Sequence, residues 1–546
     1  MRPLLLVLVL LLAGCQSPGA FLLSQAGASD EAPFSAGVAT VDYTPEGGYP
    51  LGGYGGGARR SELPFYAGMG WPGRIALSCH QAYHEDDPEG RADLLTKNEG
   101  AHEEIGARAL VLRPEGAPPL AFVRIDAIGV TSEIHDLALA HVRDLGYRRD
   151  TLILSATHTH SGPGAIFRAP LARLIAMDNY RQELEASIAA AIGKAIRQAH
   201  QAAVPAALAF ARARDRDAEG ATLLAKNRRH RRFRGEIAYD ELDDEVGLLA
   251  LVQRESREPI ALLLNYAVHP TVLGSDSLHY SRDLAGGVER GLEQVFGAPV
   301  LFLNGAEGDI GPRQLSQRGG MARCEELGEA FAALLAPSLA ELSYHERISL
   351  RTALGHKELG DPRGVVALGR ERFLDGEASW ASWPMELINL PFNLVLWTFG
   401  LTNVRVVLTW NLALGVVAHL DGLTPRTTTR IGALRLRAGE EDVVFLSVPG
   451  EATHDVGLAT RELARSAGAS RCFIAGLTFD HIGYIASRRE YRRGGYEAHS
   501  TLFGQGTAAQ VLESHRALLG ALGYEGPATK AAVEPQPDRR SDETPR

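Results

Sequence analysis

Hydrophobic and polar residues along the chain follow two patterns that alternate from one segment to the next. Short runs of Leu, Val, Ile and Phe have the length of buried strands, at 110–112, 120–125, 152–154, 248–252, 260–264, 300–303 and 443–446. Longer Ala- and Leu-rich stretches have the composition of helices, at 182–202, 322–342 and 457–467. The alternation predicts an α/β fold, in which helices flank a mixed β-sheet core. No internal repeat is visible, which argues against solenoids and propellers.

The first apolar segment has the features of an export signal. Met1 and Arg2 precede a run of Leu and Val, and Ala13-Gly-Cys15 follows it. This order resembles a bacterial lipobox, in which Cys15 is lipidated and becomes the first residue of the mature chain. We therefore expect residues 1–15 to be a lipoprotein signal peptide. The protein is then exported and anchored to a membrane, on its periplasmic or cell-surface side. An ordinary cleaved signal and an uncleaved anchor are the alternatives.

The other segments flank one large folded domain, which is expected at residues 36–522. Residues 16–35 are rich in Ser, Ala, Gly and Pro and predict a flexible tether. Residues 523–546, rich in Pro and charged residues, predict a disordered tail. Within the domain, residues 387–404 carry no charged side chain, but a proline, a glycine and three asparagines argue against a membrane-spanning helix. A membrane-interfacial element is one interpretation, and an apolar insertion packed into the core is the other.

Composition and charge exclude several classes of protein. The chain has 546 residues, of which 45% are hydrophobic, so it can bury a large core. The net charge of −10 gives no overall basic field, and the short basic stretch 228–232 does not reverse it, so we expect no nucleic-acid partner. Beyond Cys15 there are Cys79, Cys324 and Cys472, without a CxxC motif. Neither a disulfide framework nor a cysteine zinc site is predicted, although one pair could form.

Two histidines stand two residues apart at the end of an apolar run, in Ala156-Thr-His158-Thr-His160-Ser-Gly-Pro-Gly. Because successive side chains of a strand alternate between faces, we expect His158 and His160 to point to the same side. Imidazole is the commonest protein metal ligand, and the Gly-Pro turn lets a metal or substrate approach closely. The motif therefore predicts a metal or substrate pocket, with ordinary hydrogen-bonded histidines as the alternative.

Two further apolar runs end in residues of similar chemistry. These are Asn265-Tyr-Ala-Val-His269-Pro and Val448-Pro-Gly-Glu451. A capped strand end would also explain His269, and a favourable charge at a helix N-terminus would explain Glu451. Because long stretches of chain separate these positions from His158, spacing alone does not show that the three meet.

Taken together, six motifs resemble those of the neutral/alkaline non-lysosomal ceramidases and follow the order of that family. They are Ala36-Gly-Val-Ala-Thr-Val-Asp42-Tyr-Thr-Pro with Pro50-Leu-Gly-Gly-Tyr-Gly, the motif around His158 and His160, Asn265-Tyr-Ala-Val-His269-Pro, Asn304-Gly-Ala-Glu-Gly-Asp-Ile310, Val448-Pro-Gly-Glu451, and Gly483-Tyr484 with Tyr496-Glu-Ala-His-Ser-Thr-Leu-Phe-Gly504. The resemblance covers residues 36–515. It implies a single catalytic domain that hydrolyses an amide with the help of zinc.

The resemblance also implies roles for individual residues. One zinc ion per chain would be held by His158, His269, Glu451 and Tyr484. The catalytic groups of the family correspond to His160, Arg228 and Tyr496, and its substrate-binding positions to Asn227, Asp309 and Gly311. Such a site leaves room for a water, whose pKa zinc lowers toward about 7. The catalytic groups could then stabilise the oxyanion and protonate the leaving amine.

Two features depart from the family. Its hexapeptide G-D-V-S-P-N reads Gly308-Asp-Ile-Gly-Pro-Arg313 here, so Gly311 stands where the family has a serine regarded as essential. An obligatory serine nucleophile would leave this chain inactive, whereas direct attack by activated water would not. Arg313 replaces an asparagine and could suit an acidic head group, unless Glu307 or Asp309 pairs with it. The immunoglobulin-like C-terminal domain of the family is not expected.

These observations predict a zinc-dependent amidohydrolase that resembles neutral ceramidase and cleaves the N-acyl amide bond of ceramide or a related lipid amide. A membrane is expected as a partner, through lipidated Cys15 and residues 387–404. One alternative is a hydrolase of another amide or ester, such as an N-acyl amino acid or a peptidoglycan or polysaccharide fragment. The other is a surface lipoprotein that binds zinc without turnover. The retained histidine, arginine and tyrosine favour an enzyme, because a binding protein does not need them.

Overall fold

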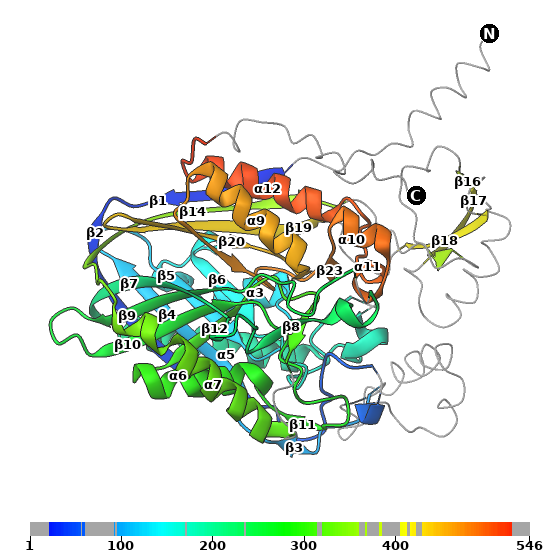
Figure 1. Ribbon diagram of the computed structural model, residues 1–546, viewed down its shortest axis with the longest axis horizontal. Coiled ribbons are helices and arrows are strands. Elements are labelled where there is room, and N and C mark those ends of the chain that lie inside the picture. The colour runs from blue at the N-terminus through cyan, green and yellow to red at the C-terminus, as the bar shows by residue number, and fades with distance from the viewer. Residues whose placement is uncertain are drawn as a thin grey trace, which may run out of the picture.

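One mixed β-sheet forms the centre of the molecule (Figure 1). The computed structural model describes residues 21–526 except 56, 60–91, 93–94, 170–171, 234–235, 314–318, 360–365, 368–381, 385–404, 412–414 and 422–427. The sheet has 13 strands. Its main path runs through β12 (Val300–Asn304), β10 (Pro259–Tyr266), β9 (Glu245–Gln253), β7 (Val204–Arg214), β2 (Ala32–Asp42), β14 (Arg347–Glu358), β19 (Thr428–Ala438), β20 (Glu441–Ser447) and β22 (Arg471–Ala475). Off this path, β1 (Phe21–Ala28) pairs with β14, and β4 (Gly106–Pro114), β5 (Leu120–Ile125) and β6 (Leu152–Ala156) extend from β2.

The sheet folds back on itself, so that two of its parts face each other across an apolar core. Phe122 on β5 packs against Phe445 on β20, with ring centroids 5.0 Å apart. Phe210 on β7 meets Phe473 on β22 edge to face at 6.3 Å. These rings belong to one buried cluster that draws Leu, Ile and Phe side chains from both parts. Burial on two faces explains why the strands read as continuous apolar runs in the sequence.

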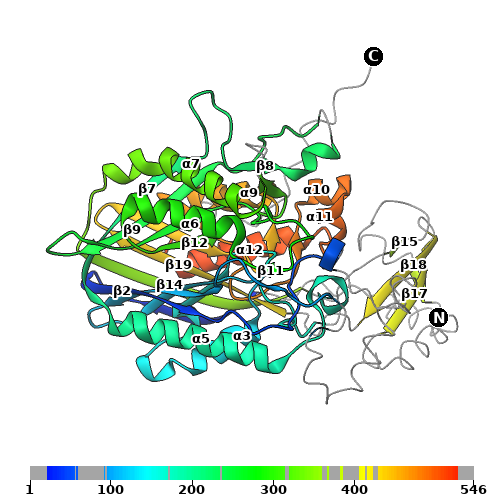
Figure 2. The same cartoon turned by 90° about the horizontal axis from the view of Figure 1, so that it is seen from below.

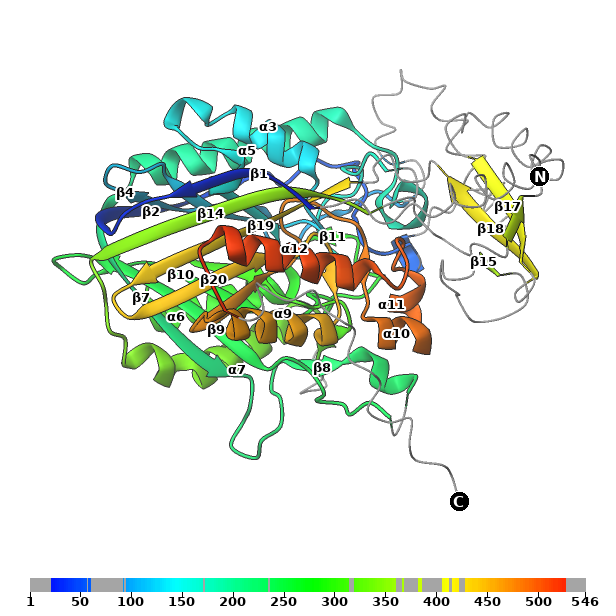
Figure 3. The same cartoon turned by 90° about the horizontal axis from the view of Figure 1, so that it is seen from above.

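Helices cover the outer faces of this folded sheet (Figures 1 and 2). They are α3 (Ser132–Ala140), α5 (Gln182–Gln201), α6 (Asp283–Phe296), α7 (Gly320–Ala340), α9 (His454–Ala467) and α12 (Thr507–Ala521). α5 packs on β2 and β4 with α3 beside it, α6 packs on β12 with α7 beside it, and Figure 3 shows α9 and α12 across β19 and β20. The predicted α/β fold, a mixed sheet flanked by helices, is therefore confirmed.

Two glycines bring α6 and α7 unusually close together. A Cβ atom on Gly287 of α6 would overlap the carbonyl oxygen of Cys324 on α7, and one on Gly328 would overlap the carbonyl oxygen of Gly287. The two helices therefore touch backbone to backbone. Any side chain at these positions would push them apart, so glycine here serves close packing rather than an unusual φ angle.

Three parallel pairs of strands determine where a site can form. β5 and β6, β10 and β12, and β20 and β22 each run parallel. Parallel strands end at the same edge of a sheet, and ligands of α/β proteins bind outside the carboxyl ends. Short pairs complete this edge: β8 (Ala225–Asn227) with β13 (Ile310–Pro312), and β21 (Glu451–Ala452) with β23 (Tyr484–Ile485). Elsewhere, β3 (Gly100–Ala101) pairs with β11 (His279–Tyr280), and β15 (Val366–Ala367), β18 (Gly415–Asp421), β17 (Arg405–Asn411) and β16 (Ser382–Pro384) form a small separate sheet.

The prediction of a flexible tether at 16–35 is wrong over most of its length. Residues 21–28 form β1, which pairs antiparallel with β14, and β2 begins at Ala32. β1 is held by backbone hydrogen bonds at a sheet edge while most of its side chains stay partly or fully exposed, so it lacks an apolar pattern. The C-terminal boundary at 522 is also too early, because Tyr524 is buried and lies under the guanidinium of Arg435, 4.1 Å from the ring centre.

Several expectations fall on residues outside the described ranges. They are the lipidation of Cys15, any pairing of Cys79, the apolar segment 387–404 and the tail beyond residue 526. Cys324 and Cys472 are both buried and both free thiols, so these two do not pair with each other. In the described part of the chain, no helix combines the length and the apolar character needed to cross a bilayer.

Candidate metal centre and its pocket

The predicted metal ligands meet at the carboxyl ends of the parallel strands. His158 follows β6, His269 follows β10, and Glu451 follows β20. Tyr484 joins them because β23 runs parallel to β21 and places Tyr484 beside Glu451. The side chains of all four are buried. Sequence reasoning thus found residues that lie far apart along the chain and come together in the fold.

His158 and His160 share one pocket, but not for the expected reason. β6 ends at Ala156, and His158 has a φ of 72°, in the left-handed region that non-glycine residues rarely adopt. The pair is therefore not on a strand, and alternation of faces does not apply. Hydrogen bonds from the backbone nitrogen of His158 to Ala127 and from the hydroxyl of Thr159 to Ser281 hold the turn instead. The two rings lie edge to face with centroids 5.0 Å apart.

Backbone carbonyls fix the outer nitrogen of each candidate ligand imidazole. Nδ1 of His158 lies 2.6 Å from the carbonyl oxygen of Ile128, and Nδ1 of His269 lies 2.8 Å from that of Glu307. A carbonyl only accepts hydrogen bonds, so Nδ1 is the protonated nitrogen in both rings. Each Nε2 then has a lone pair that faces the centre of the site, as a metal-binding histidine requires.

The ligand atoms have the separations of a tetrahedral metal site. Oε2 of Glu451 lies 3.2 Å from Nε2 of His158 and 3.3 Å from Nε2 of His269, and the hydroxyl of Tyr484 lies 3.5 Å from Nε2 of His269. Ligands at about 2.0–2.1 Å from a tetrahedral zinc ion are about 3.3 Å apart. Nε2 of His158 and Oε2 of Glu451 are buried and have no hydrogen-bond partner among the described residues. The donor set therefore fits one zinc ion.

Burial and the neighbouring charges shift the pKa values of these groups strongly. Burial, followed by the charge of Arg228, lowers the pKa of His269 to about 3. Burial alone would raise the pKa of Glu451, but the neighbouring imidazoles, His158 above all, hold it well below the usual range. A neutral imidazole beside an ionised carboxylate is the protonation state that binds a divalent cation.

The three predicted catalytic residues surround this cluster. Both ring nitrogens of His160 are buried without a hydrogen-bond partner among the described residues, and its ring lies 5.7 Å from that of His269. Nη2 of Arg228 donates to the carbonyl of Gly308 and, at 3.3 Å, to the hydroxyl of Tyr484. Tyr496 lies edge to face on Tyr484 at 5.3 Å and is 61% exposed. The groups thus approach the candidate centre from different sides.

A glycine accounts for the position of His160. Gly53 has a φ of +100°, and a Cβ atom there would lie 2.7 Å from Cγ and Nδ1 of the His160 ring. The Leu-Gly-Gly-Tyr motif of the sequence therefore forms the wall against which this imidazole packs. Tyr54, the next residue, stacks at a tilt on the same ring, with centroids 4.6 Å apart.

The predicted substrate-binding residues lie behind the centre and do not line its pocket. Asp309 is fully buried and bonds to Nδ1 of His454 at 2.6 Å, while Asn227 caps the turn η5 (Arg228–Arg231) through the backbone nitrogen of Arg229. Both residues therefore shape the segment that carries Arg228.

A Cβ atom on Gly311 would lie 2.9 Å from Cγ and Cδ of Arg228, so the stem of this arginine packs where a residue-311 side chain would begin. Arg313 lies over the ring of Tyr239, away from the pocket.

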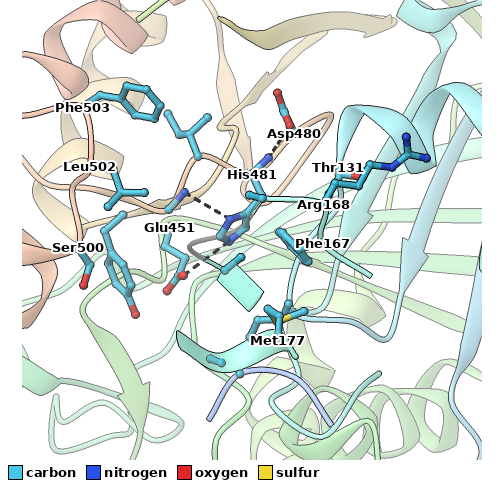
Figure 4. Close-up of a pocket in the computed structure, with 18 of the residues that line it drawn as sticks. Thr131, Phe167, Arg168, Met177, Glu451, Asp480, His481, Ser500, Leu502 and Phe503 are labelled. Atoms are coloured by element: carbon cyan, nitrogen blue, oxygen red, sulfur yellow. Dashed lines mark hydrogen bonds and ion pairs between the residues drawn. The ribbon is translucent and has the colours of Figure 1, made fainter. Parts of the chain in front are cut away.

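An apolar pocket of about 290 Å³ opens onto the cluster (Figure 4). His160, Glu451, Tyr484 and Tyr496 form its polar end. The walls are mainly apolar and come from Ile128, Phe167, Ala172, Met177, Ile482, Leu502 and Phe503. Such a pocket accepts an aliphatic chain while a polar group of the same ligand reaches the candidate metal centre.

Four residues of this region, three buried and one half-buried, were not assigned to the site from the sequence. Glu307 lies beside His158 and Glu451 within metal-binding distance, and burial together with the charge of Glu451 raises its pKa well above the usual value. His481 lines the pocket, with Nε2 3.6 Å from Oε1 of Glu451. His454 and Glu490 form a charged network with Asp309. Glu307 lies within a recognised motif, whereas nothing in the sequence around the other three marks them.

The Asp309 network is not an alternative metal site. Burial lowers the pKa of His454, but the charge and hydrogen bond of Asp309 outweigh this and raise it to about 9. Arg229 lies 3.0 Å from Glu490 as well. One ligand atom each of Asp309, His454 and Glu490 lie close enough together to bind an ion. The cationic side chains of His454 and Arg229, however, already neutralise the carboxylates of Asp309 and Glu490.

The fold and the site define the class of the protein: an α/β protein with a candidate metal centre beneath an apolar pocket. Residues 85–303 match the family model described as neutral/alkaline non-lysosomal ceramidase, N-terminal. The neutral ceramidase of Pseudomonas aeruginosa is 22% identical over 531 residues, covering 88% of this chain and 75% of that protein. The chain is thus similar to the neutral/alkaline non-lysosomal ceramidases, the family whose motifs its sequence resembles.

Solved structures share the fold. One described as ceramidase complexed with C2 superposes with a TM-score of 0.65 at 19% identity, covering 92% of this chain and 77% of the other. The crystal structure of neutral ceramidase from Pseudomonas aeruginosa gives a TM-score of 0.63 at 19% identity, covering 93% of this chain and 77% of the other. At this level of identity the likeness concerns the fold, and the chemistry of the site has to be argued from its own residues.

Proposed function

We propose that this protein is a zinc-dependent amidohydrolase that cleaves the N-acyl amide bond of ceramide or a related lipid amide. Water adds its hydroxyl group to the acyl carbon, the C–N bond breaks, and the amine leaves with the proton, so the products are a fatty acid and an amine. The observation that carries the proposal is the convergence of His158, His269, Glu451 and Tyr484 at tetrahedral spacing on an apolar pocket.

Zinc, held by these four residues, would supply a water of lowered pKa and polarise the substrate carbonyl. The side chains of the protein do the rest. Both ring nitrogens of His160 are buried, and this burial, followed by the charges of His158 and His269, lowers its pKa well below the usual value. It is therefore neutral at pH 7, and a ring nitrogen can accept a proton from water and return it to the leaving amine.

Two further groups face the developing negative charge. The guanidinium of Arg228 stays cationic, because Tyr484 and Glu497 raise its pKa despite its burial. Although much of Tyr496 is exposed, desolvation of its phenol group at the pocket and the charge of Glu451 raise its pKa, so it keeps its proton at neutral pH. A cation and a phenol O–H can both stabilise the carbonyl oxygen as it becomes an oxyanion, and removal of one such donor typically reduces kcat by roughly 10²–10³.

The glycine at position 311 favours direct attack by water. A glycine offers no hydroxyl for an acyl-enzyme, and Arg228 packs against its backbone. The proposed reaction therefore has no covalent intermediate at this position.

The test is fatty-acid release by the zinc-loaded protein in detergent, from ceramide and a small panel of N-acyl amides. His158→Ala is the inactive variant, and His102→Ala is the control, because His102 is an exposed histidine outside the pocket. We expect release from ceramide by the unmodified protein and the control only. Release solely from other amides would retain the mechanism and reject ceramide. Zinc binding without any release would favour the non-catalytic lipoprotein.

We also propose that the chain is exported and anchored through lipidated Cys15, with residues 387–404 at the membrane surface. The proposal is supported by the order of charged, apolar and small residues before Cys15. Labelled palmitate should be incorporated into the unmodified chain in a bacterial host and not into Cys15→Ser. Equal labelling of the unmodified chain and of Cys15→Ser would contradict lipidation at Cys15.

Removal of residues 387–404 should slow turnover of bilayer-embedded substrate more than that of detergent-dispersed substrate.

A further inference from the structure

The two carboxylate oxygens of Glu451 have different surroundings. Oε2 faces Nε2 of both His158 and His269, at 3.2 and 3.3 Å. Oε1 faces away from them, toward Nε2 of His481 at 3.6 Å. Figure 4 shows His481 at the pocket wall, directed at Glu451. Imidazoles thus approach this carboxylate from both sides.

The ring of His481 is held firmly in this orientation. The backbone N–H of Gly483 donates to Nδ1 at 3.4 Å, and the ring of Phe167 lies perpendicular to the imidazole at 5.4 Å. A Cβ atom on Gly129 would lie 2.5 Å from Cδ2 of the ring, so only glycine leaves room for it there. Residues from three separate segments of the chain therefore hold the imidazole in this orientation.

The same contacts fix which nitrogen carries the proton. Because Nδ1 accepts from Gly483, the proton of the neutral ring is on Nε2. This N–H is buried, and no described residue accepts a hydrogen bond from it. The nearest charged acceptor is Oε1 of Glu451. A buried donor without a partner is unfavourable, so the arrangement needs this contact or a ligand beside it.

We propose that His481 is a positioning residue for Glu451: its Nε2–H holds Oε1, so that the carboxylate presents Oε2 alone to the metal. The inference rests on the proposed metal centre. The other ligands are positioned by the backbone, since Ile128 and Glu307 fix the two imidazoles through their carbonyls. Glu451 is the carboxylate of this ligand set, and a carboxylate that can rotate binds a metal less well.

The experiment measures zinc affinity rather than activity, by competition with a chelator. His481→Phe keeps the ring shape and removes the N–H, and His481→Gln restores a donor of similar reach. We expect His481→Phe to weaken zinc binding by about 10–100-fold, the usual effect of losing a partner of a metal ligand, and His481→Gln to recover most of it. His102→Phe is the matched control at an exposed histidine and should bind zinc as the unmodified protein does.

A second readout separates positioning from general destabilisation. With cobalt(II) in place of zinc, a carboxylate freed to bind through both oxygens raises the coordination number and lowers the visible absorption of the ion. We expect this loss in His481→Phe and not in His481→Gln. If His481→Phe does not fold, His481→Asn, whose shorter amide does not reach Oε1, takes its place. Unchanged zinc affinity in both His481 variants would refute the role of His481, whereas absence of zinc binding by the unmodified protein would refute the proposed function itself.

Discussion

Gly53 and His160 show how closely the backbone approaches a predicted catalytic group. In Gly53→Ala the new Cβ would lie 2.7 Å from the imidazole, at a φ of +100°. We expect the ring to be displaced, kcat/KM to fall at least about ten-fold because a proton-transfer group contributes roughly 10²–10⁴ in rate, and zinc affinity to stay unchanged.

A control with the same backbone strain isolates the contact with the ring. Gly116 also has a positive φ, +73°, but a Cβ atom there meets nothing within 4 Å. Gly116→Ala should therefore lose stability by about 1–3 kcal/mol without loss of kcat/KM. Equal kcat/KM in both variants would show that Gly53 does not position His160.

Gly311 and Arg228 are coupled in a similar way. A Cβ atom at residue 311 would lie 2.9 Å from the stem of Arg228, whose guanidinium contacts Tyr484. We expect Gly311→Ser to shift Arg228 and reduce kcat/KM, with Gly311→Ala behaving alike because the Cβ atom causes the clash. Gly274→Ser, at an exposed glycine with open space around it, is the control. A gain of activity specific to Gly311→Ser would instead indicate that a serine nucleophile had been restored.

At the scale of single residues, the sequence identified the ligands by chemistry and position together. His269 and Glu451 each end an apolar run, so their type and place along a strand were both visible. His481 had no such signal: it sits in Asp480-His481-Ile482-Gly483, and only the fold brings it to Glu451. Asp309 and Asn227 were assigned from a family motif, and motifs also contain residues that support the backbone rather than the substrate.

Among the elements, the contact between α6 and α7 depends on residues without side chains. In Gly328→Ala the new methyl group would overlap the backbone of Gly287. We expect the helices to separate and the free energy of unfolding to fall by about 1–3 kcal/mol, the usual effect of overpacking. Urea denaturation of the folded chain measures this directly.

A second glycine in a helix provides the control for helix propensity. Gly520 lies on α12, is exposed, and has open space where a Cβ would be. Gly520→Ala should stabilise the protein by up to about 1 kcal/mol, because alanine favours the helical state. If Gly328→Ala were stabilising as well, close packing of α6 on α7 would not limit the residue at this position.

Elements were predictable in proportion to how much apolar surface they bury. β4, β5, β9 and β12 are buried almost throughout and appeared as continuous apolar runs. β1 contributes backbone hydrogen bonds rather than buried side chains, so its sequence resembled a linker. The pairing of β21 with β23 was equally invisible, because strands of two residues have no periodicity.

For the whole molecule, the buried pair of His454 and Asp309 predicts a dependence of stability on pH. The pKa of His454 is raised to about 9 from an unfolded value near 6.5, so its contribution is complete below pH 6.5 and is lost as the pH rises through 9. The difference corresponds to about 3 kcal/mol. Glu490 acts in the same direction, because burial and the charge of Asp309 raise its pKa to about 7.

The measurement is the free energy of unfolding in urea at pH 6 and at pH 9.5. The unmodified protein should lose about 3 kcal/mol more than His454→Gln over this interval, because glutamine has no proton to release. An equal pH dependence in the two proteins would assign the loss to other groups.

The route by which the chain builds its centre has a consequence for how it folds. His158 lies in the first third of the sequence and Tyr484 near its end, and β2, close to the N-terminus, touches β14 from the second half. Contacts of such high sequence separation form slowly, because the entropy of closing long loops is lost before the contacts stabilise the chain. A ribosome-bound chain that ends before residue 451 contains the ligands His158 and His269 but not Glu451. It also lacks β21 and β23, whose pairing places Tyr484 in the site. The site can therefore reach its final affinity for the metal only after synthesis is nearly complete. Metal binding would then be one of the last steps of folding rather than a step that starts it.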